Sequence, residues 1–554
     1  MKLKITSIAL FILILPNFCP AQTSKYFIRF ADRNNNPYSV SNPAPYLSQR
    51  AIDRRLTQGI SIQQNDLPVN PDYVDSVISR GAAILSKSKW FNGVTIEADL
   101  PTLQSVLSLP FVLQSVHVQR PKPFAPEHEK TETKFDEPQI HQDESLPRVS
   151  SFDYGASLTQ IQIMNGDYLH DSGFRGEGKL IAVLDVGFYQ VNVLPAFDSL
   201  RNNNQVVATW DFVSNESGVY EDSSHGMSVL STIGGYLPGQ LVGTAPKAGF
   251  LLLRTEEQTT EFLVEEYYWN AGAEFADSAG ADIISSSLGY TTFDDPSQNH
   301  TYADMNGHTN PSSVAANIAF SKGMLVVVSA GNSGGGSWQY ISSPADADSA
   351  LAVGAVNGAG NYAFFSSTGP SSDGDIKPNV SAVGQGTIIV RRSGSIGPGN
   401  GTSFSCPVLA GSAACLWQAF PGSSNRSIFN AIQQSASQHL TPDSLLGYGI
   451  PNFMMAGLIL GTPGIGRSEN GTLLTVYPNP FNHDVFLNYY SESDQKISIQ
   501  IFDAVGKIIH ESKKEATGKT YNTSILSLKD LQSGVYFLEM ISAGGKEVRK
   551  IIKL

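Results

Sequence analysis

The sequence has little cysteine, little positive charge and no long hydrophobic run after its first segment. Three cysteines in 554 residues exclude a disulfide-rich scaffold and leave no set of four thiolates for a zinc site. Asp and Glu outnumber Lys and Arg by 50 to 37, and the formal net charge is −13. A nucleic-acid partner is therefore not expected, because phosphate contacts need clustered Lys and Arg. We also expect no transmembrane segment, since no run reaches about 20 apolar residues.

The remaining composition is that of a folded, turn-rich chain with several domains. Hydrophobic residues make up 41% of the sequence, which also holds 50 glycines and 30 prolines, and disordered chains are poorer in apolar residues. A length of 554 residues exceeds the roughly 250–300 residues at which single cores stop growing. The chain is therefore expected to form several domains.

Residues 1–21 are typical of a secretory signal peptide. A short basic start precedes an apolar core over residues 8–15, and Cys19 and Ala21 supply the small residues before a cleavage site. The apolar core is too short to span a bilayer. The segment predicts export from the cytoplasm.

Residues 22–121 follow an α+β pattern. Apolar alternation and helical periodicity predict, in order, a strand at 26–30, helices at 47–56 and 73–80, a strand at 92–98, a helix at 102–107 and a strand at 112–118. Residues 122–151 then become rich in Pro, Glu, Lys and His without aliphatic periodicity. That composition is typical of a linker.

Residues 152–460 alternate between short apolar runs and helical patterns. The runs suit buried parallel strands and lie at 180–184, 250–253, 282–284 and 324–328. Helical patterns lie between them, for example at 261–279 and 312–322. The alternation predicts an α/β domain in which a parallel sheet is flanked by helices.

A Gly- and Pro-containing linker at 461–472 leads into a third region, residues 473–554. Turns with Gly, Asn and Asp separate short strand patterns at 484–490, 496–503, 507–511, 534–541 and 548–554. About 80 residues of this kind predict a small β-sandwich.

The strongest chemical signal lies at residues 401–411, which read GTSFSCPVLAG. Gly401 permits a tight entry, and Ser403 falls at the start of a helix of small residues, where developing negative charge faces the positive helix end. Pro407 lies near the first turn, where a missing N–H costs little. An ordinary helix start after a glycine-rich loop is the alternative, so the motif is only suggestive by itself.

A nucleophilic serine also needs a base and a group that orients the base. Asp185 follows the apolar run at 180–184, where a carboxylate can orient an imidazole, although turn and capping aspartates are commoner. His225 alone among the ten histidines is followed by a glycine and a small-residue helix, although single histidines are more often surface residues. Asn332 lies just past another buried run, placed to donate to an oxyanion; a plain turn is its alternative.

Together these residues resemble the subtilisin-like serine proteases, or subtilases. The chain order Asp185, His225, Ser403 is that of the subtilases and differs from the orders in chymotrypsin-like enzymes and α/β-hydrolases. The 40 residues from Asp185 to His225 and the 178 from His225 to Ser403 leave room for intervening strands and helices. The resemblance covers about 300 residues, and the combination of motifs is far more specific than any one of them.

The resemblance implies a role for each residue. Ser403 would be the nucleophile, His225 the general base and then acid, and Asp185 the orienting carboxylate. Asn332 and the Ser403 backbone N–H would form the oxyanion hole. Two segments would bind the substrate backbone and flank the pocket for the residue before the cut: Ser287, Leu288 and Gly289, and Ser329, Ala330 and Gly331. No cofactor is required for this chemistry.

Two positions depart from the family pattern. Val186 stands where the family usually has Ser or Thr after the aspartate, and Met227 stands where it usually has Thr two places after the histidine. Both departures bear on substrate preference and rate more than on the reaction class. Structural calcium is common in subtilases, and loops at 294–295 and 373–375 could hold it; solvated loops are the alternative.

The flanking regions carry resemblances of their own. By position and pattern, residues 22–121 resemble the subtilase pro-domain that assists folding and blocks the active site, which implies a zymogen cut in the linker. The third region, with YPNPF at 477–481 and a basic tail at 546–554, resembles the C-terminal sorting domain of the type IX secretion system. That implies the type IX machinery as a partner and export across the outer membrane to the surface or the medium. A generic β-sandwich, for example a carbohydrate-binding module, is the alternative.

Two functions from different classes follow. The first is a secreted serine endopeptidase, made as a zymogen, that cuts proteins or peptides through an acyl-enzyme on Ser403. The second is a non-catalytic surface protein that grips peptides on a subtilase fold. A third motif, G-x-S-x-G at 331–335, fits the nucleophile elbow of α/β-hydrolases, but residues 334–338 read GGGSW instead of opening the helix that an elbow requires.

Overall fold

The computed structural model describes residues 22–120, 152–221 and 223–461, and residues 474–554 apart from 478, 479, 482, 492, 519 and 544. The predicted signal peptide and both predicted linkers lie outside the described residues, except for Gly461. The chain divides into two compact units, Met1–Gly461 and Thr462–Leu554, and each is described by itself.

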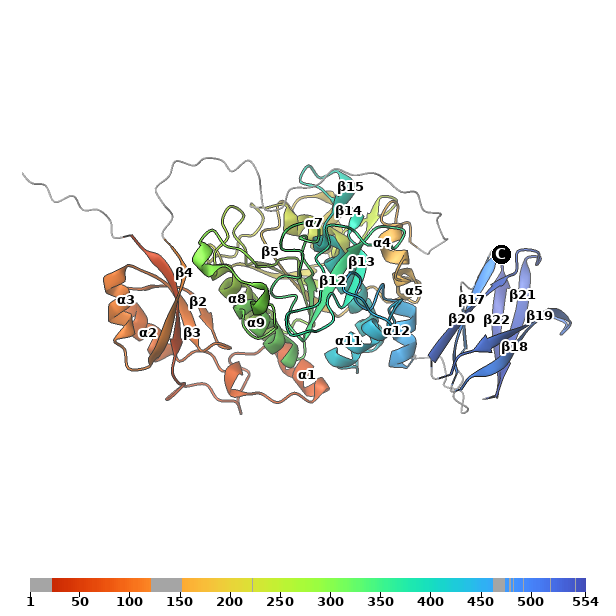
Figure 1. The fold of residues 1–554 in the computed structure, drawn as a ribbon, viewed down its shortest axis with the longest axis horizontal. Helices are drawn as coiled ribbons and strands as arrows, with labels where there is room; N and C mark the ends of the chain where they lie inside the picture. The colour runs from red at the N-terminus through yellow and green to blue at the C-terminus, as the bar shows by residue number, and fades with distance from the viewer. Residues whose placement is uncertain are drawn as a thin grey trace, which may run out of the picture. The chain divides into compact units, whose positions relative to one another are not determined.

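The N-terminal part of the first unit is an antiparallel sheet covered by two helices (Figure 1). In spatial order its strands are β2 (Ala83–Ser88), β3 (Gly93–Ala98), β1 (Ser24–Phe30) and β4 (Val112–Gln119). Apolar residues of β1 and β3 share a core with α2 (Pro71–Ser79) and α3 (Leu100–Leu107). A further helix, α1 (Gln49–Gln58), contributes no residue to this core. The sequence predicts all of these elements except β2.

The second part of this unit, from residue 152 onward, holds a seven-stranded sheet in which every pair of neighbouring strands is parallel. In spatial order the strands are β13 (Val380–Val383), β12 (Ala350–Val356), β11 (Leu325–Ser329), β10 (Ile283–Ser286), β5 (Leu180–Asp185), β9 (Gly249–Arg254) and β6 (Val206–Asp211). The sequence predicts β5, β9, β10 and β11. It misses β6, β12 and β13. Strands β12 and β13 are wholly buried, but Ala, Gly and Ser interrupt their apolar runs.

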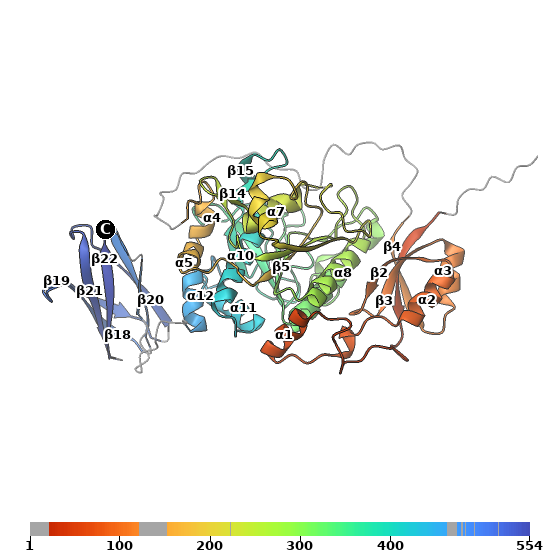
Figure 2. The same ribbon diagram turned by 180° about the vertical axis from the view of Figure 1, so that it is seen from behind.

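Helices flank this sheet, as predicted. The longer ones are α7 (His225–Gly234), α8 (Val264–Ala279), α9 (Pro311–Ser321), α10 (Thr402–Ala419), α11 (Asn425–Gln434) and α12 (Phe453–Leu460). Helix α8 packs on α9, and α7 lies beside α10 (Figure 2). A hairpin of β14 (Gln385–Val390) and β15 (Ile396–Asn400) leads directly into α10. Among the described residues, no helix has both the length and the apolar character needed to cross a membrane.

The carboxyl ends of three neighbouring strands carry predicted site residues. Asp185 ends β5, Ser287 follows β10, and Ser329 ends β11, and these strands are consecutive in the sheet. In a parallel sheet such ends meet at one edge, where open α/β sheets bind their ligands. Helix α10, which carries Ser403, packs against β10 and β11.

Buried polar groups support the segment that follows β10. Tyr290 and Ser343 exchange both of their backbone hydrogen bonds. The Ser343 hydroxyl lies 2.7 Å from that of Ser313, which donates to Asp346. Burial raises the pKa of Asp346 to about 6, against the lowering effect of its hydrogen bonds. Nearby Lys377 donates to two backbone carbonyls, and burial lowers its pKa to about 8.

The second unit consists of two antiparallel sheets around one core, as the β-sandwich prediction requires. One sheet has the order β16 (Leu474–Tyr477), β17 (Asp484–Ser491), β20 (Thr520–Ser527), and the other has the order β19 (Ile508–Ala516), β18 (Gln495–Phe502), β21 (Gly534–Ser542), β22 (Gly545–Lys553). Buried residues of both sheets, among them Leu487 and Leu538, form the core. The sequence misses only β16 and β20.

The buried Asp346 and Lys377 predict how stability depends on pH. The pKa of Asp346 is raised from 3.8 to about 6, so folding takes up a proton, and the free energy of unfolding falls as pH rises from about 4 to about 6. The pKa of Lys377 is lowered from 10.5 to about 8, so the free energy of unfolding rises again from about pH 8 to about pH 10.5.

We therefore expect Asp346→Asn to gain thermal stability relative to its parent as pH rises from about 4 to about 6. The parent is the full chain carrying Ser403→Ala, which prevents digestion during the measurement. Melting temperatures measured by circular dichroism across this range provide the test. A difference between the two proteins that stays constant with pH would contradict the assignment of this titration to Asp346.

Candidate active site

Asp185 and His225, 40 residues apart in the sequence, are hydrogen-bonded to each other. The Asp185 side chain is fully buried, and 8% of the His225 side chain is exposed. His225 Nδ1 lies 2.7 Å from Asp185 Oδ1, which also accepts the Val186 N–H at 2.8 Å. When Nδ1 carries the proton and donates it to this carboxylate, Nε2 is the ring nitrogen that can accept another proton.

Gly226 allows α7 to begin directly against the end of β5. A Cβ at this position would lie 2.4 Å from the carbonyl oxygen of Gly187 and 3.0 Å from Cγ of Asp185. The first distance is shorter than real Cβ contacts and the second is tighter than most of them, so a larger residue would push the helix away from the end of β5 and crowd the carboxylate. The His-Gly pair in the sequence is thus a steric requirement of the Asp185–His225 contact.

Ser403 is the second residue of α10 and is largely buried. Its backbone carbonyl accepts a hydrogen bond from Ser287 Oγ at 2.9 Å, which ties the first turn of α10 to the end of β10. The ring centroid of the next residue, Phe404, lies 6.3 Å from that of His225. The serine and histidine motifs are therefore neighbours, and the positive end of α10 faces this region.

Asn332 Nδ2 and the Ser403 backbone nitrogen both lie near Gly401. Asn332 Oδ1 accepts hydrogen bonds from the N–H of Thr402 at 2.9 Å and from its hydroxyl at 3.0 Å, so the amide is oriented by its oxygen. A Cβ built on Gly401 would lie 3.7 Å from Asn332 Nδ2 and 3.6 Å from Ser403 N. Asn332 Nδ2 and the Ser403 backbone nitrogen therefore both lie near Gly401, at the start of α10.

The two predicted substrate segments face each other across Ser342. Cβ atoms at Gly289 and Gly331 would lie 2.2 Å and 3.3 Å from Ser342 Oγ. The side chains of Ser287, Leu288, Ser329 and Ala330 are buried, so these segments can offer a ligand little except their backbone, as strand addition requires. Beyond Asn332 lies a cavity of about 390 Å³ whose lining includes Trp338, Phe364 and Phe365.

Sequence analysis assigns no role to Thr402 or Ser342. Thr402 stands inside the motif that points to Ser403, but its hydrogen bonds go to Asn332, 70 residues away. Ser342 lies in no recognisable sequence motif. The hydrogen bonds that orient the Asn332 amide, and the position of Ser342 between the two substrate segments, can be seen only in the folded chain.

The two departures from the family pattern lie next to the Asp185–His225 contact and are both fully buried. Asp185 Oδ2 is buried and accepts no hydrogen bond from any described residue. Val186 adjoins it with an apolar side chain, where Ser or Thr would bring a hydroxyl. Met227 packs into the main core. The aspartate therefore accepts its hydrogen bonds through one oxygen.

One predicted calcium loop belongs to an acidic group. The carboxylates of Asp348, Asp373 and Asp375 lie within 4.8 Å of one another and are exposed. Lys377 interacts electrostatically with all three, so positive charge is already present beside them, and they do not require a metal ion. Asp294 and Asp295 join no such group among the residues that the structure describes. Calcium binding stays a prediction.

Comparisons with known proteins cover all three regions. Residues 176–449 match the subtilase family of S8 peptidases, residues 25–137 match the peptidase S8 propeptide domain of Bacteroidota, and residues 475–554 match the secretion system C-terminal sorting domain. Subtilisin of Bacillus pumilus is 32% identical over 292 residues, which is 52% of this chain and 94% of that protein.

Two further relatives agree. Subtilisin E of Bacillus subtilis (strain 168) is 32% identical over 292 residues, 52% of this chain and 68% of that protein. Subtilisin Savinase of Lederbergia lenta is 31% identical over 284 residues, 51% of this chain and 92% of that protein.

These matches confirm the three resemblances seen in the sequence. The sorting domain marks the chain for type IX export to the cell surface or the medium, and the propeptide domain marks it as a zymogen. The chain belongs to the subtilase family and is a serine endopeptidase of the subtilisin type.

Proposed function

We propose that this secreted endopeptidase hydrolyses peptide bonds in proteins through an acyl-enzyme on Ser403. One observation carries the proposal: the fully buried Asp185 carboxylate lies 2.7 Å from His225 Nδ1. This pairing is the one that the proposed mechanism requires, because it holds Nδ1 as the donor and leaves Nε2 to accept a proton. No contact among the described residues favours the non-catalytic alternative, in which these groups would be idle.

In the first half of the reaction, Ser403 Oγ attacks the carbonyl carbon of the scissile bond while His225 Nε2 takes its proton. Asp185 stays ionised, holds the ring in place and stabilises the imidazolium. His225 then gives the proton to the leaving amine, the C–N bond breaks, and the acyl group remains on Ser403 Oγ. In the second half, water attacks the acyl carbonyl carbon while His225 Nε2 takes its proton; the ester bond breaks, His225 returns the proton to Ser403 Oγ, and the acid leaves.

Asn332 Nδ2 and the Ser403 N–H would stabilise the negative charge that develops on the carbonyl oxygen. Thr402 is the positioning residue for this pair, because both of its donors bind Asn332 Oδ1. This leaves the amide nitrogen to serve the oxyanion. No cofactor takes part in any step.

The substrate would lie between the two backbone segments. Ser287, Leu288 and Gly289 would pair with it on one side, and Ser329, Ala330 and Gly331 on the other. The side chain before the cut would enter between Gly289 and Gly331, with Ser342 at the base. Proteins or peptides are the expected substrates.

The proposed domain boundaries follow the sequence. They are a signal peptide at 1–21, the propeptide at 22–121, a linker at 122–151, the catalytic domain at 152–460, a second linker at 461–472 and the sorting domain at 473–554. Self-cleavage would fall in the first linker and would activate the enzyme. The type IX machinery would be the partner of the last domain.

Replacing the nucleophile should abolish both labelling and processing. We expect a fluorophosphonate probe to label the mature protein, and we expect Ser403→Ala to lose labelling and to keep its first linker uncut, as measured by intact-mass spectrometry. Ser405→Ala is the matched control, since Ser405 is buried two residues further on and its hydroxyl donates to the Thr402 carbonyl. Labelling that survives in Ser403→Ala would disprove the assignment.

Removing the side-chain oxyanion donor should lower turnover and leave binding nearly unchanged. For Asn332→Ala we expect kcat to fall roughly 10²–10³-fold, and for Thr402→Val we expect a smaller fall, because the donor remains but loses its orientation. Steady-state kinetics on a peptide substrate separate kcat from KM. An unchanged kcat in Asn332→Ala would remove it from the oxyanion hole.

A methyl group at Gly226 should disrupt the Asp185–His225 contact. We expect Gly226→Ala to lose at least about 100-fold in kcat/KM, because its Cβ would overlap Gly187 and crowd Asp185. Gly457→Ala is a matched helical control, whose Cβ would meet only Phe420 at ordinary contact distance. Equal activities for the two variants would contradict the steric role of Gly226.

A further inference from the structure

The propeptide region is attached to the catalytic region through buried charges. We call this group the Asp277 cluster. The residues from the propeptide are Arg54, Arg55, Asp66 and Lys89, and those from the catalytic region are Asp277 and Lys322. No side chain in the cluster is more than 9% exposed. Buried ions are costly unless each is paired and hydrogen-bonded, so the cluster exists only while both regions are in place.

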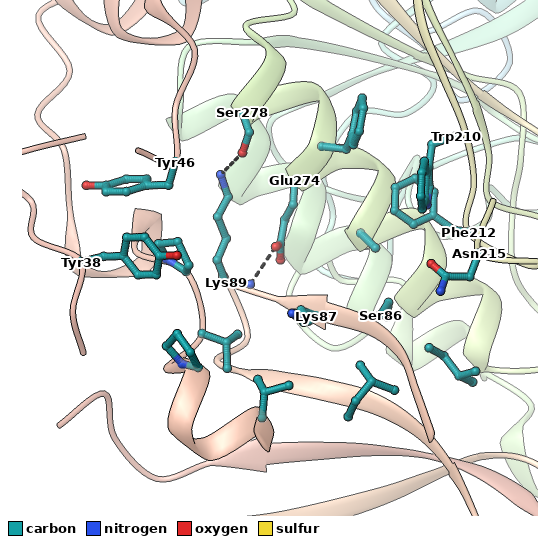
Figure 3. A pocket seen from close by; sticks show the side chains of 18 of the residues that line it. Tyr38, Tyr46, Ser86, Lys87, Lys89, Trp210, Phe212, Asn215, Glu274 and Ser278 are labelled. Atoms are coloured by element: carbon teal, nitrogen blue, oxygen red, sulfur yellow. Dashed lines mark hydrogen bonds between the residues drawn. The ribbon is translucent and has the colours of Figure 1, made fainter. Parts of the chain in front are cut away.

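Asp277 lies in the last turn of α8 and accepts from three propeptide cations. Arg54 Nη2 lies 2.5 Å from Oδ1, and Arg55 Nη2 lies 2.8 Å from the same oxygen. Lys89 Nζ lies 2.7 Å from Oδ2 and also donates to Ser278 Oγ (Figure 3). One catalytic-domain carboxylate thus gathers three cations that are distant from it in the sequence.

Asp66 and Lys322 form the reciprocal half of the cluster. Asp66, from the propeptide, accepts from Arg55 Nη2 at 2.8 Å and from Lys322 Nζ at 3.1 Å. Each region therefore supplies both signs of charge to the other. Separation would leave Asp277 without any of the cations that bind it here.

Helix α1 docks mainly by charge. Its residues Arg54 and Arg55 are buried, whereas Leu56, one of its two large aliphatic side chains, is 78% exposed. Arg54 also donates to the backbone carbonyls of Ala281 and Lys322. The face that α1 turns toward the catalytic region thus carries arginines, with Arg54 and Arg55 in the cluster and Arg50 beside it.

The rest of α8 carries other kinds of contact with the propeptide. Phe27 stacks on Tyr267 with ring centroids 4.5 Å apart. Glu274 accepts from the backbone N–H groups of Lys89 at 2.7 Å and of Trp90 at 3.0 Å. A cavity of about 650 Å³ opens beside Lys89 and Glu274 (Figure 3), so apolar packing is incomplete here, and charge has to hold this part of the interface.

The charge on Asp277 persists across the ordinary pH range. Burial would raise its pKa, but Lys89, Arg55 and Arg54 together hold the pKa well below the usual value for an aspartate. An ionised carboxylate at this depth is stable only with its partners present. Release of the propeptide must therefore re-solvate Asp277 as well as the arginines.

We propose that Asp277 is the recognition site for the dibasic helix of the propeptide, and that it retains the propeptide on the enzyme after the linker is cut. The ligand class is a helical segment with two adjacent arginines, supported by one lysine from a neighbouring turn. This inference rests on the proposed function only in taking residues 22–121 as the propeptide.

The test uses the full chain with Ser403→Ala and with a recognition sequence for an unrelated protease placed in the linker at 122–151. After that protease has cut, only non-covalent contacts hold the N-terminal fragment, and its release on dilution is followed by native mass spectrometry. We expect Asp277→Asn to release the fragment roughly a hundredfold faster than the parent, because the variant leaves buried cations uncompensated.

The matched control is Arg50→Gln. It breaks another ion pair between the same two regions, that of Arg50 with Asp282, but the Arg50 side chain is 40% exposed. Pairs with an exposed partner contribute little, and Asp282 keeps Lys179 as a partner at 3.8 Å, so the release rate should change by less than about fivefold. Equal release rates for Asp277→Asn and Arg50→Gln would overturn the proposal.

Lys89→Met covers the case in which Asp277→Asn does not fold, as judged by circular dichroism of the uncut chain. It removes one cation and leaves Asp277 with both arginines, so we expect release roughly tenfold faster than in the parent. No acceleration in Lys89→Met would also overturn the proposal. All of these chains lack the Ser403 hydroxyl, so their release rates are independent of whether Ser403 is the nucleophile.

Discussion

The site depends on a helix that begins directly against the end of a buried strand. Asp185 ends β5, His225 begins α7, and the residue after the histidine can only be glycine, because a Cβ there would lie 2.4 Å from a backbone oxygen. That approach brings the imidazole to 2.7 Å from the carboxylate. Helix α10 then brings Phe404, the residue after Ser403, to a ring-centroid distance of 6.3 Å from His225, and Thr402 at its start binds Asn332 Oδ1. The proposed chemistry follows from these steric conditions.

Much of the architecture could be predicted from the sequence, because several of the buried parallel strands are short, largely apolar stretches of the sequence. Strands β5, β9, β10 and β11 are of this kind. Strands β12 and β13 are equally buried but consist largely of Ala, Gly, Ser and Val. Their burial depends on contacts with residues that are distant in the chain, and the sequence alone does not show those contacts. The four polar residues of the proposed chemistry were identifiable because each one follows or opens an element with a recognisable pattern.

What could not be predicted are contacts whose partners are far apart in the chain. Thr402 was visible beside Ser403, but its role depends on Asn332, on a different element. Helix α1 shows clear helical periodicity, yet the face that it buries carries Arg54 and Arg55, residue types that are seldom fully buried without partners. Their partners, Asp277 and Asp66, lie in no recognisable sequence motif. The same charge cluster joins the propeptide region to helix α8 of the catalytic region.

The most direct test of the proposed mechanism is to trap the acyl-enzyme. The mature enzyme is mixed with an activated ester, quenched in acid during turnover and mapped by tandem mass spectrometry. The account predicts an acyl group on the peptide that contains Ser403, located on that residue. An acyl group on another residue, or turnover with no acylated peptide, would contradict it.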